Sequence, residues 1–196
     1  MAGLTLLGLE SMAPVIVLAA VVLLPLVWLI GTYNGLVRLR THCRESWAGI
    51  DTELRRRYDL IPNLVETVKG YAAHERQTLQ AVVEARSRAA GSTGSPADQA
   101  RDENMLVGSL RQLFAISENY PDLKASGNFL HLQQELANTE DRIQAARRFY
   151  NANVRDFNTR TEIFPSSIIA GLFRFRKQEF FEIESAAARA VPAVDV

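Results

Sequence analysis

Residues 12–30 read Met-Ala-Pro-Val-Ile-Val-Leu-Ala-Ala-Val-Val-Leu-Leu-Pro-Leu-Val-Trp-Leu-Ile, a run of 19 residues without a charged or strongly polar side chain. A helix needs about 20 such residues to cross a hydrocarbon core of about 30 Å. Pro25 removes one backbone hydrogen bond, which membrane-spanning helices tolerate. Trp28 and Tyr33 lie at the C-terminal edge, where amphipathic rings favour the headgroup layer. The run therefore predicts a transmembrane helix.

The charges around this run argue against a cleaved signal peptide and predict the orientation of the chain in the membrane. The first ten residues contain no Lys or Arg, so the basic n-region of a signal peptide is missing. Glu10 precedes the run, whereas three arginines follow it: Arg38, Arg40 and Arg44. Because basic residues are retained on the cytoplasmic side, we expect a single-pass cell-membrane protein. Residues 1–11 would lie outside the cell, residues 12–32 would span the membrane, and the rest would lie in the cytoplasm.

The composition narrows the classes of function. The chain has 196 residues, with 22 basic and 22 acidic side chains. Broad nucleic-acid binding needs a clustered basic excess, so we expect no nucleic-acid partner. Cys43 is the single cysteine. An internal disulfide framework and a thiolate metal site are therefore excluded, because both need several sulfur atoms.

The residues after the apolar run read as helices rather than strands. From Tyr33 onward, apolar side chains recur every three or four positions instead of every second position. The first of these helices is expected to continue straight out of the membrane to about Arg57. We predict an all-α fold, in which the transmembrane helix is followed by an antiparallel up-down four-helix bundle with long helices over residues 33–163.

Pro62 interrupts the helical pattern. Proline disfavours the helical conformation in the residue before it, and it fits best in the first turn of a new helix. The sequence Asp59-Leu60-Ile61-Pro62 therefore predicts a turn, with Asp59 as the cap of the second helix. One long helix that is kinked at Pro62 is the alternative.

A second loop and a helix start lie further along the chain. Gly91-Ser92-Thr93-Gly94-Ser95 is rich in residues that break helices. Ser95-Pro96-Ala97-Asp98 then offers a capping hydroxyl, a proline at the first helical position and an acid in the first turn. We expect the third helix to begin here and to end near Asn119.

The fourth helix carries the most regular repeat. Its apolar seam alternates steps of three and four, a heptad pattern typical of coiled coils and bundles. The seam comprises Phe129, Leu132, Leu136, Thr139, Ile143, Ala146, Tyr150, Asn153 and Phe157. We interpret the polar seam residues Thr139 and Asn153 as fixing the register. Asn151, Asn153 and Asn158 are expected to make hydrogen bonds across the bundle.

The C-terminal segment, residues 164–196, is apolar at its start and then basic. Ile163 to Phe173 contains few polar side chains, and Arg174, Arg176 and Lys177 follow. An even number of helices would return this segment to the bilayer, where apolar rings beside basic side chains suit the membrane surface. Residues 164–181 are therefore one candidate for a second lipid contact. The alternative is that this segment closes the end of the bundle.

No recognisable pattern of catalytic or metal-binding residues occurs. The histidines, His42, His74 and His131, show no i, i+4 pair, and no Glu-x-x-His motif is present. Cys43 falls on the apolar seam of the first helix, as a small core residue would. Arg55-Arg56-Arg57 is interpreted as favouring the helix dipole at the end of that helix, with a partner-binding patch as the alternative. We therefore expect no enzyme, and no catalytic, cofactor-binding or metal-binding residues.

Several long stretches match one family. They are Tyr33-Asn34-Gly35-Leu36-Val37, Arg56 to Tyr71, Glu118 to Ala125, Leu132 with Leu136 to Glu140, Arg147-Arg148-Phe149-Tyr150-Asn151, Phe157-Asn158 and Phe164-Pro165. Through them the chain resembles the LemA family of bacterial membrane proteins, although the loop from Gly91 to Pro96 departs from the family pattern. The resemblance implies an N-terminal anchor, an extracellular N-terminus and an antiparallel helical bundle. It supplies no established biochemical activity.

Two functions are compatible with these features. Relatives of the family are known in magnetosome membranes, and the genes often neighbour a membrane metalloprotease. We expect a membrane-anchored scaffold or adaptor that contacts the lipid bilayer and self-associates or binds a protein partner. The alternative is a regulator of envelope quality control that acts with a membrane metalloprotease.

Overall fold

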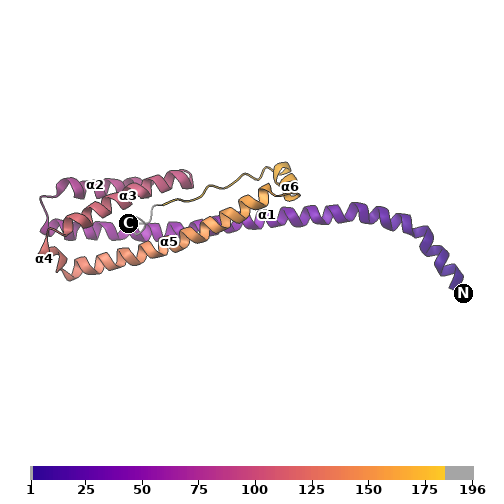
Figure 1. Ribbon diagram of the computed structural model, residues 1–196, viewed down its shortest axis with the longest axis horizontal. Coiled ribbons are helices and arrows are strands. Elements are labelled where there is room, and N and C mark those ends of the chain that lie inside the picture. The colour runs from indigo at the N-terminus through magenta and orange to yellow at the C-terminus, as the bar shows by residue number, and fades with distance from the viewer. Residues whose placement is uncertain (1, 184–196) are drawn as a thin grey trace, which may run out of the picture. The chain divides into compact units, whose positions relative to one another are not determined.

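The computed structural model describes residues 2–183, and within that range every regular element is a helix (Figure 1). The helices are α1 (Ala2–Tyr71), α2 (Arg76–Gly91), α3 (Pro96–Ser117), α4 (Pro121–Lys124), α5 (Gly127–Glu162) and α6 (Ser166–Leu172). The all-α prediction is confirmed. Residues 184–196 of the expected C-terminal segment lie outside the described residues.

Helix α1 continues through Pro62, so the expected turn there and the capping role of Asp59 are wrong. Pro62 has no N–H to donate to the carbonyl of Tyr58, which is its partner four residues earlier. The guanidinium of Arg86 on α2 donates to that carbonyl instead, with a Nε–O distance of 2.7 Å. A side chain from another helix therefore replaces the bond that proline removes, and α1 remains unbroken.

The chain turns at residues 72–75 instead. The amide of Ala72 still donates to the carbonyl of Val68, and the amide of Glu75 donates to the carbonyl of Ala72. The hydroxyl of Tyr120 donates to the Glu75 carboxylate at 3.0 Å. A contact from the distant α3–α4 connection thus holds a turn that contains no proline.

Packing divides the chain into two units. The first consists of residues up to Thr41 together with Asp156–Lys177, and the second consists of His42–Arg155 and the described residues from Gln178. Both α1 and α5 contribute to each unit. The two units are described separately below.

In the first unit, α1 exposes its apolar side chains. Within the described residues it is the one helix long and apolar enough to cross a membrane. The exposed side chains are Val15, Val17, Leu18, Val21, Val22, Leu23, Leu24, Leu26, Val27, Trp28 and Ile30. Burial by the protein itself begins with Thr32 and Leu36. A helix whose apolar side chains remain exposed over this length is suited to a lipid bilayer.

Aromatic rings join the other parts of the first unit to α1. The ring of Tyr33 lies 4.7 Å from that of Phe173 and 5.7 Å from that of Phe175. Phe175 also contacts Phe157 at 6.3 Å, and the guanidinium of Arg40 lies 5.0 Å from its centroid. These contacts fix the end of α6 and the residues after it against the part of α1 that follows the apolar run.

The second unit has an apolar core built from α1, α2, α3 and α5. Fully buried members include Ile50, Ile61, Leu64, Val68, Val82, Leu106, Leu113 and Ile143. Ion pairs link α1 with α5, and α2 packs along α3. The predicted loop before α3 is confirmed: Ser95 and Asp98 form a reciprocal capping box.

The seam predicted for α5 faces inward. Six of its nine residues are buried: Phe129, Leu136, Thr139, Ile143, Tyr150 and Phe157. The Thr139 hydroxyl, however, donates to the Glu135 carbonyl of its own helix at 2.7 Å. Nδ2 of Asn153 has no hydrogen-bond partner in the part of the chain that the structure describes. Nδ2 of Asn153 therefore does not make the hydrogen bond across the bundle that was expected of this side chain, and Thr139 bonds within its own helix.

A buried ionic cluster as candidate functional site

An arginine and a glutamate occupy core positions of the second unit. On α1, Arg57 lies among the buried residues Leu54, Tyr58 and Ile61. On α3, Glu103 takes a place in the inward-facing series Ala100, Glu103, Leu106, Val107, Leu110 and Leu113. Helical spacing alone therefore directs both charged side chains into the core.

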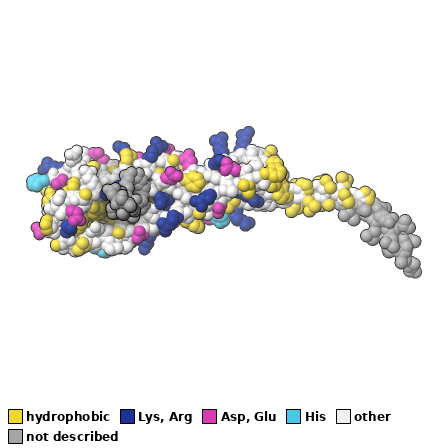
Figure 2. Space-filling model, in the orientation of Figure 1, with side chains coloured by type: hydrophobic (Ala, Val, Ile, Leu, Met, Phe, Trp, Pro, Cys, Tyr) yellow, Lys and Arg dark blue, Asp and Glu magenta, His cyan; other side chains and the backbone are white. Residues whose placement is uncertain are grey.

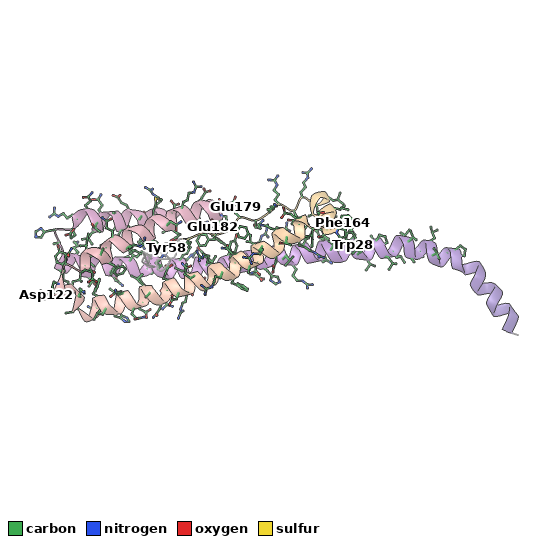
Figure 3. All side chains as sticks on the ribbon, viewed as in Figure 1. Trp28, Tyr58, Asp122, Phe164, Glu179 and Glu182 are labelled. Atoms are coloured by element: carbon green, nitrogen blue, oxygen red, sulfur yellow. The ribbon has the colours of Figure 1, made fainter. Side chains whose placement is uncertain are left out.

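These residues form a hydrogen-bonded cluster that joins three helices. Nη2 of Arg57 donates to Oε2 of Glu103, and Nη1 donates to Oε2 of Glu140 on α5 at 2.9 Å. The hydroxyl of Tyr58 donates to the other oxygen of Glu103. The side chains of Arg57 and Glu103 are each only 2% exposed. We call Arg57, Tyr58, Glu103 and Glu140 the ionic cluster; Figure 3 labels Tyr58.

Burial governs the protonation of the ionic cluster. It raises the pKa of the Glu103 carboxyl, and the neighbouring Arg57 guanidinium and Tyr58 hydroxyl oppose that rise. Burial and the adjacent Glu103 raise the pKa of the Tyr58 phenol, so this hydroxyl stays protonated and donates. The cluster thus holds one cation against two carboxyl groups, deep in a low-dielectric interior.

The ionic cluster links three helices through hydrogen bonds between protein groups. Both oxygens of Glu103 accept hydrogen bonds from protein donors. Oε1 of Glu140, the more exposed acid, accepts from Gln144 at 2.7 Å. Nε of Arg57 is the one donor of that guanidinium for which the described residues supply no partner.

An open groove lies beside the ionic cluster. It is a cavity of about 480 Å³ between α3 and α5, with Arg57 and Glu140 in its lining. Its other lining residues are Val107, Leu110, Arg111, Phe114, Gln133, Leu136, Ala137, Asp141 and Gln144. We call this cavity the α3–α5 groove. Its walls combine apolar side chains with side chains of both charge signs.

A model of the LemA family matches residues 46–196. The matched range includes all four residues of the ionic cluster and the whole α3–α5 groove. It covers well over half of the chain. The chain belongs to the LemA family.

Curated relatives support this assignment. Protein LemA of Metamycoplasma hominis is 26% identical over 170 residues, which cover 85% of this chain and 74% of that protein. Magnetosome protein MamQ of Magnetospirillum gryphiswaldense is 24% identical over 197 residues, covering 86% and 72%. Magnetosome protein MamQ 2 of Paramagnetospirillum magneticum is 24% identical over 175 residues, covering 76% and 64%. Together with the bare apolar helix, these relatives indicate a membrane-associated LemA-family protein.

The LemA-like stretches contain most of the ionic cluster. Arg57 and Tyr58 come from the stretch Arg56 to Tyr71, and Glu140 ends the stretch that begins at Leu136. The interpretation of the arginine run as favouring the end of a helix is wrong, because α1 does not end there and Arg57 is buried. No motif in the sequence marks Glu103 as a site residue. Its one signal is an acid at an apolar position of α3.

The histidines and the cysteine of this LemA-family chain lie apart from the ionic cluster. His42 on α1 pairs with Glu45 at 3.3 Å, while His74 lies in the α1–α2 turn and His131 near the start of α5. Cys43 is buried. Among the residues that the structure describes, no group of three or more His, Cys, Asp or Glu side chains is placed to hold a metal ion.

A second polar site of the LemA-family core holds the chain after Gln178. Asn151 forms two hydrogen bonds with Phe181: its Nδ2 donates to the carbonyl at 3.0 Å, and its Oδ1 accepts from the amide at 2.9 Å. The Tyr150 hydroxyl donates to the carbonyl of Glu179 at 2.9 Å. The Phe181 ring is buried against Trp47, with centroids 5.1 Å apart. We call residues 178–183 the strap.

Proposed function

We propose that this protein is a single-pass membrane scaffold or adaptor, with its N-terminus outside the cell and its second unit in the cytoplasm. In this proposal α1, α2, α3 and α5 form an antiparallel four-helix bundle. The observation that carries it is the contrast between the two polar features of the core. The charged groups of the ionic cluster are paired with one another, whereas the α3–α5 groove beside them is open.

The α3–α5 groove suits an amphipathic helix of a protein partner. Leu110, Phe114 and Leu136 offer apolar surface to one face of such a helix. Arg111 and Asp141 offer charges of opposite sign to its flanks. Recognition of this kind needs no chemistry by the scaffold itself. A second copy of the chain would satisfy it as well as another protein would.

Photo-crosslinking in native membranes tests the scaffold proposal. A photoreactive amino acid at Gln133 or Ala137, both exposed in the groove lining, is expected to give a discrete adduct. The same residue at Val83, which is exposed on α2, serves as the matched control and is expected to give none. Coexpression of two differently tagged copies separates self-association from binding of another protein. Monomer alone at both groove positions would contradict the proposal.

Impermeant thiol labelling tests the orientation. The variant Val83→Cys presents an exposed thiol on α2, whereas the natural Cys43 is only 2% exposed and sets the background. We expect labelling of Val83→Cys only after the cells are permeabilised. Labelling in intact cells would place the second unit outside the membrane and overturn the proposed orientation.

A further inference from the structure

The outer face of α6 and its flanks is apolar. Phe164 lies in the turn before α6, and Ile168 and Leu172, four residues apart, share one side of the helix. They are 80%, 58% and 67% exposed, while Ser166, Ile169 and Ala170 on the opposite side are buried. Figure 2 shows hydrophobic side chains gathered at this end of the first unit. Single exposed apolar residues are common, but a whole exposed helix face that is apolar marks an interaction surface.

The contacts of Tyr33 place this apolar face at the end of the membrane-spanning run. Tyr33 stands three residues after Ile30, which is about 4.5 Å along a helix. The headgroup layer on each side of a bilayer is about 5–7 Å thick. Because Phe173 and Phe175 pack on the Tyr33 ring, α6 lies at the depth of that layer. Figure 3 labels Phe164 and Trp28 at a similar level along α1.

Basic side chains border the apolar face. Arg174, Arg176 and Lys177 are exposed immediately after α6. Lys177 pairs with Glu162 of the same unit, whereas no ion pair of Arg174 is found among the described residues. Cations beside inserted apolar side chains favour a membrane that contains anionic lipid.

We infer that residues 163–177 form a second membrane contact of this protein. Phe164, Ile168 and Leu172 enter the boundary between headgroups and acyl chains of the bilayer that α1 spans, and Arg174 contacts anionic headgroups. The inference rests on the proposed membrane span of α1. The contact does not extend to the strap, because Phe181 is buried against Trp47.

Depth-dependent fluorescence quenching in nanodiscs tests this contact on the full-length chain. An environment-sensitive fluorophore is attached to Ile168→Cys, to Val21→Cys within the apolar run, or to Val83→Cys on α2. Labelling of the parent chain measures any background from the buried Cys43. Lipids that carry a quencher at the acyl-chain boundary are expected to quench the Ile168→Cys probe several-fold more than the Val83→Cys probe.

The three labelled positions distinguish failure of the second membrane contact from failure of the α1 span. Strong quenching at Val21→Cys with none at Ile168→Cys would overturn the second contact while leaving the α1 span intact. Absence of quenching at Val21→Cys would overturn the span and the inference that rests on it. The substitution Arg174→Gln is expected to reduce quenching at Ile168→Cys only when anionic lipid is present. The matched substitution of the exposed Arg142, Arg142→Gln, is expected to leave it unchanged; an equal effect of both would contradict the role of Arg174.

Discussion

Arg57 links three helices in the interior of the second unit. Its guanidinium contacts carboxylates from two other helices while its side chain is almost fully withdrawn from solvent. The desolvation of such a group offsets much of its Coulombic attraction, so an intact buried ion pair contributes little net stability. Removal of one partner is different, because it leaves an unpaired charge in the core. The ionic cluster is therefore expected to affect the free energy of unfolding mainly when one of its charged partners is removed.

Replacement of Arg57 tests this reasoning. We expect Arg57→Met to lower the free energy of unfolding by about 3–5 kcal/mol, because Glu103 loses its buried counter-ion. The double variant Arg57→Met with Glu103→Leu should recover much of that loss. Denaturant titration of the full chain in detergent, followed by circular dichroism, measures both effects. Arg55→Met, at a largely exposed arginine, is the control; an equal loss there would contradict a special role of the cluster.

The raised pKa of Glu103 predicts a pH dependence of stability. A carboxyl group whose pKa is higher in the folded state stabilises the fold below its ordinary value of 4.5. That contribution is lost as the pH rises from 4.5 through the higher folded-state pKa. Glu103→Gln should therefore flatten the decline of Tm across this range. Glu45→Gln, at an exposed acid, should leave the profile unchanged.

At the scale of the element, α1 shows how a helix survives an internal proline. The missing hydrogen bond at the Tyr58 carbonyl is supplied by Arg86 of α2. A hydrogen bond from a charged donor contributes about 1.5–3 kcal/mol. That amount is comparable with the penalty of about 3 kcal/mol for proline within a helix. Pairing between two helices thus stabilises the secondary structure of one of them.

A double-mutant cycle tests this compensation. We expect Arg86→Met to destabilise the protein by about 2 kcal/mol, because the Tyr58 carbonyl loses its donor. In a Pro62→Ala background, the backbone N–H of residue 62 returns to that carbonyl, and Arg86→Met should have a much smaller effect. Thermal unfolding of the four proteins gives the coupling energy. Equal effects in both backgrounds would show that Arg86 acts elsewhere.

Local signals predicted some elements well and missed others. The Gly91–Ser95 loop, the capping box and the inward face of α5 are all predicted from residues that lie close together in the sequence. The structure contains all three features. The turn at residues 72–75 is joined by a hydrogen bond to Tyr120, which lies 45 residues away from Glu75, so no local pattern indicates this contact. The ionic cluster is likewise formed by residues that are distant in the sequence. Arg57 and Glu103 explain each other only once α1 and α3 are side by side.

On the scale of the whole molecule, each unit is completed by chain from beyond residue 155. The first unit takes up residues 156–177, and the second takes up the strap. The sequence is compatible with two roles for the C-terminal segment, contact with the membrane or closure of the end of the bundle. The structure assigns Phe181 to the core of the second unit, while the apolar face of α6 remains exposed.

The attachment of the strap is testable by hydrogen exchange. The amide of Phe181 donates to Oδ1 of Asn151. A bond of about 1 kcal/mol corresponds to roughly a five-fold change in local opening. We expect Asn151→Ala to accelerate amide exchange at Phe181 by at least that factor. Asn138→Ala, at an exposed asparagine that accepts a hydrogen bond from Gln134, should not change it; unaltered exchange in Asn151→Ala would show that ring packing alone holds the strap.

The pairing of Pro62 with Arg86 also restricts the order in which this sequence can evolve. A lineage that loses Arg86 first passes through a destabilised intermediate, whereas one that loses Pro62 first passes through a protein that is at least as stable as before. Arg86 can be replaced without a large loss of stability only after Pro62 has been replaced. Two positions 24 residues apart on different helices should therefore show epistasis, because loss of the arginine at 86 is strongly destabilising only while proline remains at 62.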